Sequence, residues 1–181
     1  MNTFFKEVQS RFPEYKVTPL DTTTHKNVLR LSKDGHSLVA KTIWHDRSNP
    51  KGDMGIKVQD DAYETEVKIL SMLPKWWGIQ LIDHFKTKNN RIIVTNEIVT
   101  IPRRKGLASL SKQIKWLHAH KIAHNDLELK NILFTVNGPI IIDFEKARFM
   151  ASKEMMLRDY SLLFESMNEH RKMRFTRKRI N

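Results

Sequence analysis

The chain has 181 residues, no cysteine, and 32 basic against 20 acidic side chains, which gives a formal net charge of +12. This length allows one domain or two small lobes, and the lack of cysteine excludes a disulfide framework and thiolate metal sites. No run of 18 apolar residues is present, so no membrane-spanning helix is expected, and residues 1–11 lack the apolar core of a signal peptide. So high a charge predicts an anionic partner, and by itself leaves open nucleic acid, a membrane surface and phosphorylated ligands.

Apolar periodicity predicts alternating helices and strands in the first hundred residues. In order, these are a helix over 2–12, strands over 28–31 and 38–44, a loop over 45–60, a helix over 61–73, and strands over 78–85 and 91–99. Pro13 and Pro19 predict a break after the first helix. The Asp34-Gly35 pair predicts a hairpin between the first two strands, and residues 88–90 predict the turn of a second one.

The second half of the sequence is mainly helical in pattern. Its expected elements are a linker over 102–106, a helix over 107–117, a loop over 118–130, strands over 132–135 and 139–143, a helix over 153–167 and a basic tail over 171–179. The last helix has as its candidate core residues Met156, Leu157, Leu162, Leu163, Phe164 and Met167. This order predicts a small α+β lobe packed on an α lobe, with a ligand-binding cleft between them.

Four short motifs carry the residues suited to phosphate chemistry. A His-x-Asp-x-x-x-x-Asn pattern runs from His124 to Asn131, and Asp143-Phe follows an isoleucine run twelve residues later. Upstream, Lys41 ends a Leu-Val-Ala-Lys strand and Glu66 lies on the following helix. In this order, and on these element types, the motifs resemble those of the protein-kinase-like superfamily.

The resemblance covers residues 28–144 and implies an α+β, two-lobed kinase-like fold. It implies an N-lobe with a small antiparallel sheet and a helix (about 1–100), a truncated helical C-lobe (about 107–170) and a basic tail (171–181), which together form one domain. The implied activity is transfer of the γ-phosphate of ATP to a hydroxyl group with Mg²⁺ as the metal.

The resemblance also assigns roles to residues of the catalytic loop. Asp126 is expected to orient the acceptor hydroxyl and take its proton, while His124 braces the loop. Asn131 and Asp143 are expected to hold magnesium, because amide and carboxylate oxygens suit a hard cation. Lys130 is expected to act on the transferred phosphate, with a plain surface charge as the alternative interpretation.

A second group of residues is implied to bind the nucleotide. Lys41 is expected to contact the phosphates that are not transferred and Glu66 to orient it through an ion pair, with Glu64 as the rival for that role. The backbone of Glu97 and Val99 is expected to bind adenine by hydrogen bonds. These five residues are implied by the resemblance and do not follow from their spacing alone.

Three departures from the protein-kinase pattern bear on the substrate. Residues 21–26 stand in place of the glycine-rich loop, so that their hydroxyl groups and Lys26 would have to bind the phosphates of the nucleotide. Glu145 stands where the glycine of Asp-Phe-Gly is usual. Glu128 stands where serine kinases have a lysine, while Lys130 supplies a base two residues later.

The last two departures resemble bacterial lipopolysaccharide core kinases, which phosphorylate Kdo or heptose sugars. That group has an acidic residue and a base after Asp-Phe, and a base just before the metal-binding asparagine. The short chain and the basic tail also resemble small Bud32-like atypical kinases, although those keep Asp-Phe-Gly, and minimal effector kinases of pathogens are a third similarity.

These resemblances predict an ATP-dependent phosphotransferase whose acceptor is a lipopolysaccharide core sugar on an anionic glycolipid. The alternatives are a small serine/threonine protein kinase and an inactive kinase-fold scaffold that binds nucleic acid through residues 171–179. We favour an anionic glycolipid or protein acceptor over nucleic acid. The expected location is cytoplasmic, with peripheral contact at the inner face of the membrane.

Overall fold

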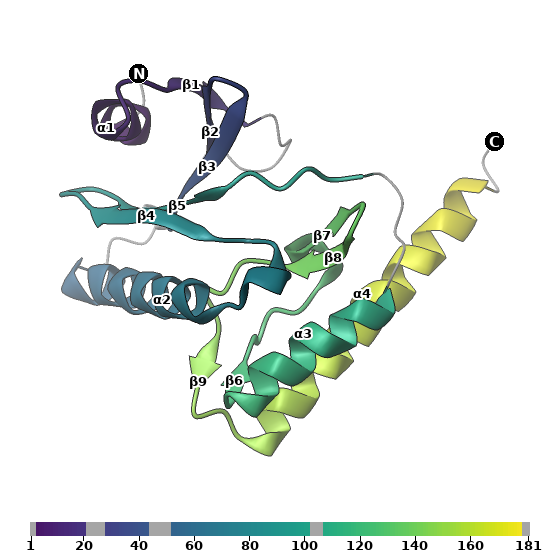
Figure 1. The fold of residues 1–181 in the computed structure, drawn as a ribbon. Coiled ribbons are helices and arrows are strands. Elements are labelled where there is room, and N and C mark those ends of the chain that lie inside the picture. The colour runs from purple at the N-terminus through teal and green to yellow at the C-terminus, as the bar shows by residue number, and fades with distance from the viewer. Residues whose placement is uncertain (1–2, 21–27, 44–51, 102–106, 179–181) are drawn as a thin grey trace. The chain divides into compact units, whose positions relative to one another are not determined.

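The chain divides into two compact units, Met1–Ile98 and Val99–Asn181. The structure is a computed structural model that describes residues 3–20, 28–43, 52–101 and 107–178. The first unit contains an antiparallel sheet and two α-helices, and the second contains two α-helices and two short strand pairs (Figure 1). The α+β class predicted from the sequence is therefore confirmed.

A five-stranded antiparallel sheet forms the centre of the first unit, in the order β1-β2-β3-β5-β4. Its strands are β1 (Lys16–Pro19), β2 (Val28–Lys33), β3 (His36–Thr42), β4 (Leu81–Lys86) and β5 (Arg91–Asn96). Both predicted hairpins, β2–β3 and β4–β5, are confirmed. In the first, Asp34 and Gly35 have φ angles of +48° and +79°, the left-handed conformation that favours Asp-Gly in a two-residue hairpin turn.

Strand β1 lies where the sequence predicts a break. It occupies an edge of the sheet and buries Val17, and it ends at Pro19, whose missing N–H is tolerated on an edge strand. Its four residues are too few for an alternating pattern to stand out. Pairing with β2 therefore determines its extended conformation. The two prolines did not indicate that a strand lies between them.

Helix α1 (Thr3–Arg11) confirms the predicted N-terminal helix. It buries Phe4 and Val8 against the sheet, as the helical spacing of its apolar residues requires. The buried core that they join is made of residues from β1, β2, β3 and β5, namely Val17, Leu29, Leu31, Ala40, Ile92 and Val94.

Helix α2 (Gly52–Met72) begins nine residues before the predicted start at residue 61, so the expected loop over 45–60 is wrong from Gly52 onward. A glycine inside a helix costs about 1 kcal/mol relative to alanine. The two glycines among the 21 residues of α2 therefore do not prevent the helix from forming. The remainder of that loop, up to residue 51, lies outside the described residues. The C-terminal end is as predicted, because Pro74 follows it.

The second unit combines two helices with two strand pairs. Its elements are α3 (Leu107–Ala119), β6 (Ile122–Ala123), the 3-10 turn η2 (Leu129–Asn131), β7 (Ile132–Thr135), β8 (Gly138–Ile141), β9 (Arg148–Phe149) and α4 (Lys153–Lys178). The predicted strands after residue 130 form the hairpin β7–β8. Strands β6 and β9 pair with each other and were not predicted, because two residues show no periodicity. The predicted linker over 102–106 lies outside the described residues.

A buried glutamine holds the β7–β8 hairpin against α3. The side chain of Gln113 is 5% exposed and donates through Nε2 to the carbonyl oxygen of Pro139 at 2.7 Å. Its Oε1 accepts a hydrogen bond from the backbone N–H of Ile141 at 2.8 Å. Both ends of one amide thus fix the strand that leads into Asp143.

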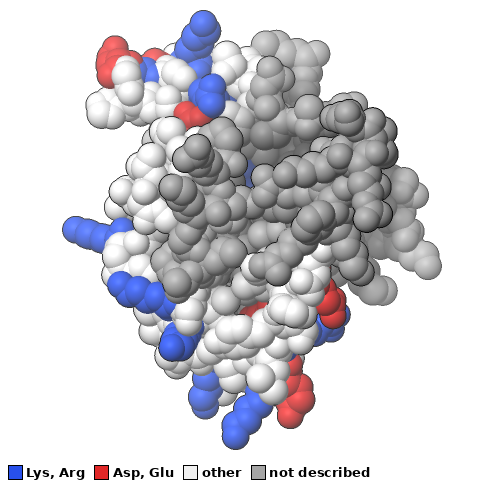
Figure 2. Space-filling view, turned by 90° about the vertical axis from the view of Figure 1, so that its right-hand side faces the viewer, with Lys and Arg blue, Asp and Glu red and all other residues white. Residues whose placement is uncertain are grey.

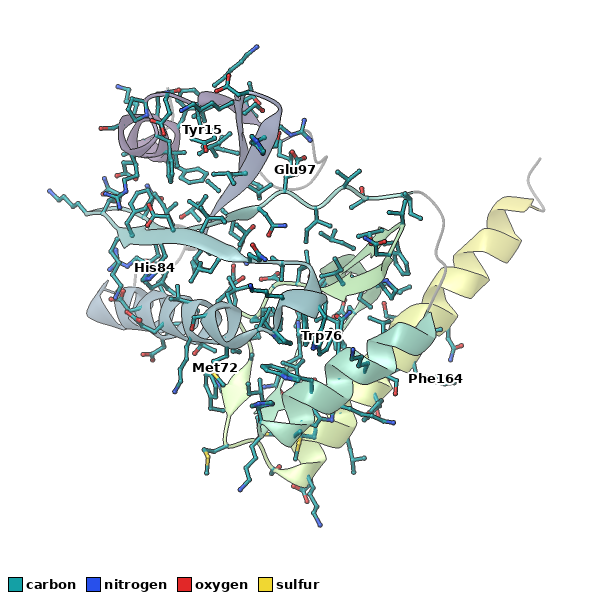
Figure 3. All side chains as sticks on the ribbon, in the orientation of Figure 1. Tyr15, Met72, Trp76, His84, Glu97 and Phe164 are labelled. Atoms are coloured by element: carbon teal, nitrogen blue, oxygen red, sulfur yellow. The ribbon has the colours of Figure 1, made fainter. Side chains whose placement is uncertain are left out.

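Helix α4 buries the face that the sequence predicts only in part: Met156, Leu162, Leu163 and Met167 are half-buried. Leu157 and Phe164 were predicted as core residues but are 65% and 66% exposed, and Phe164 is labelled in Figure 3. Among the described side chains of α4, which run to residue 168, Asp159 is the one that is buried. The inward side of the helix therefore carries a buried carboxylate among half-buried apolar residues. No helix in the described segments is both long and apolar enough to cross a membrane.

An ion-pair network on the first unit sets an expectation for acid stability. Asp60 on α2 accepts hydrogen bonds from Arg91 at 2.8 and 3.2 Å and pairs with Lys86 at 3.2 Å. The hydrogen bond from Arg91 is the main cause that lowers the pKa of Asp60 to about 2. The ordinary value is about 3.9, so the stabilisation is complete above about pH 4 and is lost as the pH falls toward 2.

We therefore expect the Asp60→Asn variant to lose less stability than the wild type on acidification from about pH 4 to about pH 2. The measurement is the free energy of unfolding in urea at a series of pH values. Asp61→Asn is the matched control, because Asp61 is an exposed neighbour on the same helix. The same pH dependence for both variants would contradict the expectation.

Candidate active site

The loop from His124 to Asn131 is held at its start by one buried carboxylate. Asp159 of α4 is fully buried, and its Oδ2 and Oδ1 accept hydrogen bonds from the backbone N–H groups of His124 at 2.9 Å and Asn125 at 2.8 Å. The ring nitrogen Nε2 of His118 on α3 lies 3.0 Å from Oδ2. One carboxylate thus binds the first two residues of the loop and a side chain of α3.

The far end of the same loop is also fixed by α4. The hydroxyl oxygen of Ser166 accepts a hydrogen bond from the backbone N–H of Leu129 at 2.9 Å, at the start of η2. Asp159 and Ser166 are seven residues apart, so they lie on one face of the helix. These two contacts set which side of α4 faces its unit and leave Leu157 and Phe164 exposed.

His124 supports the loop from inside. Its ring is fully buried, and burial lowers its pKa, so the imidazole is neutral near pH 7. Nε2 donates to the carbonyl oxygen of Ile142 at 3.0 Å and Nδ1 accepts from the backbone N–H of Asp126 at 3.3 Å. The ring also packs beside that of Phe144, with 5.2 Å between centroids. These contacts suit the expected bracing role.

Asp126 is the centre of a cluster of donors. Its Oδ2 accepts a hydrogen bond from Nδ2 of Asn131 at 3.1 Å and lies 3.1 Å from Nζ of Lys146 and 3.5 Å from Nζ of Lys130. Burial opposes ionisation, but the hydrogen bond from Lys146 and the charges of both lysines outweigh it and lower the pKa of Asp126. The carboxylate is therefore ionised and fixed in orientation, with 13% of the side chain exposed.

The two lysines of this cluster differ in their surroundings. Lys130 also pairs with Glu128 at 3.2 Å, and although burial opposes it, the contacts with Glu128 and Asp126 raise its pKa. Lys146 was not among the predicted site residues. In the sequence it is a base three residues after Asp143. Its role could not be inferred from the sequence, because it is the fold that brings it close to Asp126.

The amide of Asn131 is suited to hold a metal with the carboxylate of Asp143. Asn131 is 4% exposed, and its Nδ2 donates to Asp126 at both the backbone oxygen (2.8 Å) and Oδ2 (3.1 Å), so the amide oxygen faces away from Asp126. The backbone oxygen of Asn131 accepts from the N–H of Ile142 at 3.0 Å, which ties it to the residue before Asp143. Carboxylate oxygens of Asp143 and Glu145 lie within 4.8 Å of each other. Such an oxygen donor set fits Mg²⁺.

In the first unit, the predicted ion pair between Lys41 of β3 and Glu66 of α2 is present. Nζ lies 2.8 Å from Oε2, and the two side chains are 23% and 5% exposed. The rival Glu64 pairs instead with Lys86 at 2.6 Å and is 60% exposed. The structure thus distinguishes two glutamates that the sequence left open.

The remaining predicted nucleotide residues are only partly described. Glu97 follows β5, where its backbone N–H donates to the oxygen of Ser37 at 3.0 Å and its side chain accepts from Nε of Arg30 at 3.0 Å (Figure 3). The backbone N–H of Glu97 is thus already engaged in a hydrogen bond within its own unit. Val99 is 79% exposed and begins the second unit. Lys26, with the rest of residues 21–26, lies outside the described residues.

Comparison with known proteins agrees with these motifs. Residues 91–180 match the model of the lipopolysaccharide kinase (Kdo/WaaP) family. Serine/threonine-protein kinase 36 of Pongo abelii is 28% identical over 109 residues, which cover 52% of this chain. Both similarities support the assignment of the chain to the protein-kinase-like superfamily.

The two similarities support a kinase activity for this protein-kinase-like chain. The family match includes the whole loop from His124 to Asn131, together with Asp143. The chain spans only 8% of the length of the curated relative that it matches, so that relative's activity as a whole is not transferred to it.

The bracing role of Asp159 leads to a test of the kinase-like second unit. Asp159→Ala removes the acceptor of two backbone N–H groups, and each buried unpaired donor costs about 1–3 kcal/mol. We expect the free energy of unfolding to fall by at least about 2 kcal/mol, measured by urea denaturation. Glu165→Ala, an exposed carboxylate on the same helix, is the control and is expected to change it by less than about 0.5 kcal/mol. Equal effects of the two substitutions would contradict the bracing role.

Proposed function

We propose that the chain transfers the γ-phosphate of ATP to a hydroxyl group, and that its acceptor is a sugar of the lipopolysaccharide core. The observation that carries the proposal is the Asp126 carboxylate, which is kept ionised by Lys146 and Lys130 and oriented by Asn131. A fixed, partly exposed carboxylate of this kind can orient a hydroxyl group and accept its proton. The sequence predicts that Lys130 acts on the transferred phosphate; because it pairs with both Asp126 and Glu128, we assign it instead to positioning the carboxylate.

The other predicted residues take complementary roles. Asn131 and Asp143 would hold Mg²⁺, which when bound neutralises charge on the phosphates. Lys41, oriented by Glu66, would contact the phosphates that are not transferred. Adenine would bind to the carbonyl oxygen of Glu97 and to the backbone of Val99.

The acceptor is proposed from the family match, whose description names lipopolysaccharide, and from the charge. The match contains both Lys130 and Glu145, the departures from the protein-kinase pattern. A net charge of +12 favours an anionic acceptor. In this proposal the chain acts in the cytoplasm, in peripheral contact with the inner face of the membrane. In Figure 2, basic side chains of the described residues lie at separate places on the visible face, with acidic ones among them.

The similarity to a serine/threonine-protein kinase supports a second candidate, in which the acceptor is a protein hydroxyl. The same residues would perform the transfer, so the two candidates differ in acceptor alone. An inactive scaffold is disfavoured, because Lys41, Asp126, Asn131 and Asp143 are all retained.

A transfer assay with labelled ATP and magnesium tests this proposal. We expect label on lipopolysaccharide core and none on a panel of protein acceptors. Asp126→Ala is expected to lower the rate by about 10²–10⁴-fold, because the group that accepts the proton is removed. Asp143→Ala is expected to abolish transfer, because a metal ligand is lost. Asp61→Ala, at an exposed position of α2, is the control.

Label on protein alone would replace the sugar acceptor with the second candidate. Full transfer by both Asp126→Ala and Asp143→Ala would show that the site is assigned to the wrong residues. ATP that is neither hydrolysed nor transferred would reject the kinase function itself.

A further inference from the structure

Lys146 is fixed to the catalytic loop twice. Its side chain reaches Oδ2 of Asp126 at 3.1 Å, and its backbone oxygen accepts a hydrogen bond from Nδ2 of Asn125 at 3.2 Å. Lys146 lies within a turn, in which the backbone N–H of Ala147 donates to the carbonyl oxygen of Phe144 at 3.0 Å. Phe144 and Ala147 are both fully buried. The fold therefore presents Lys146 from a rigid turn.

The conformation of Asn125 helps to fix the turn that carries Lys146. Its φ angle is +61°, a left-handed conformation that non-glycine residues adopt uncommonly, although asparagine tolerates it better than most. In this conformation the side chain reaches the backbone of Lys146 while its own N–H binds Asp159. Asn125 thus connects the buried brace, the loop and the turn that carries Lys146.

The charge of Lys146 is less compensated than that of Lys130. Lys130 lies between two carboxylates, at 3.5 Å from Asp126 and 3.2 Å from Glu128. Among the described residues, the carboxylate that Lys146 pairs with is that of Asp126 alone. The Lys146 side chain is 64% exposed, so its ammonium group faces solvent beside Asp126. A rotation of its own side chain is therefore sufficient for the ammonium group to contact a bound anion.

The distances place this ammonium group close to the reaction. An acceptor hydroxyl oriented by Asp126 lies about 2.6–3.2 Å from its carboxylate. The phosphorus that it attacks lies about 3–3.5 Å farther on in a reactive arrangement. An ammonium group 3.1 Å from the same carboxylate is therefore within reach of the transferred phosphoryl oxygens.

We propose that Lys146 is a catalytic residue that binds the phosphoryl group during its transfer. The inference rests on the proposed phosphotransfer function and adds to it a residue that the motifs do not assign. The acceptor oxygen forms a bond to the γ-phosphorus, and the bond from that phosphorus to the bridging β–γ oxygen breaks. ADP leaves with the electron pair, and the hydroxyl proton passes to the carboxylate of Asp126. Lys146 keeps its protons and donates hydrogen bonds to the phosphoryl oxygens, on which charge is spread in the transition state.

The test compares the full-length wild type with Lys146→Gln, Lys146→Arg and Lys130→Gln. Lys115→Gln is the matched control, because Lys115 is an exposed lysine on α3 of the same unit. Initial rates of ADP release and of label transfer are measured against acceptor concentration, so that kcat and KM are obtained separately. Thermal melts establish that each variant is folded.

We expect Lys146→Gln to lower kcat by about 10²–10³-fold, as loss of one donor to a developing anion does, and to change the acceptor KM by less than about threefold. Lys146→Arg should recover at least about tenfold of that loss, because it keeps the positive charge. Lys130→Gln should have the smaller effect on kcat, and Lys115→Gln should behave as the wild type.

Three results would overturn the assignment while leaving the proposed function intact. They are a kcat within about twofold of the wild type in Lys146→Gln, a loss confined to the acceptor KM, and an arginine variant as slow as the glutamine variant. A wild-type chain that neither transfers the phosphate nor releases ADP would reject the proposed function and this inference together.

Discussion

A single buried carboxylate organises the second unit. Asp159 accepts hydrogen bonds from two consecutive backbone N–H groups, which leaves the first residues of the loop with one arrangement, and a partner on α3 completes its surroundings. Because a buried carboxylate is costly unless it is fully hydrogen-bonded, the helix that carries it must keep its polar side inward. The orientation of α4, the left-handed conformation of Asn125 and the placement of Asp126 all follow from this constraint.

The chemistry that the site supports is one of positioned charges. Phosphoryl transfer needs reactants held in line and negative charge neutralised more than it needs covalent participation by the protein. The described residues supply such groups in both units, as the Lys41–Glu66 pair in the first and the cluster around Asp126 in the second. Each charged group is oriented by a hydrogen bond or an ion pair, so little reorganisation is required when substrates bind.

What the sequence predicted was local. The two hairpins of the first unit have their turn residues beside β-branched strands, and the motif around Asp126 is contiguous, so both could be found without the fold. The start of α2, the edge strand β1 and the pair β6–β9 could not, because tertiary contacts decide them. Helical spacing marked Leu157 and Phe164 correctly as one apolar stripe but could not show that the helix packs through Asp159.

The same distinction between local patterns and long-range contacts applies to the candidate site. The family resemblance implied Lys41 and Glu66 and left Glu64, on the same helix, as a rival; in the structure Lys41 pairs with Glu66, and Glu64 pairs with Lys86. The sequence marks Lys146 only as the base that follows Asp-Phe and an acidic residue, and gives it no role, because its proximity to Asp126 depends on a turn and on the conformation of Asn125. Residues whose role is set by a long-range contact are thus the ones that the sequence analysis missed.

The central claim is that these residues form an ATP- and magnesium-dependent phosphotransfer site. A crystal structure with a non-hydrolysable ATP analogue and magnesium tests it most directly. The account predicts a metal ion bound by the amide oxygen of Asn131 and the carboxylate of Asp143, with Lys41 on the phosphates and the terminal phosphate facing Asp126. A nucleotide bound elsewhere, or a metal held without Asn131 and Asp143, would contradict it.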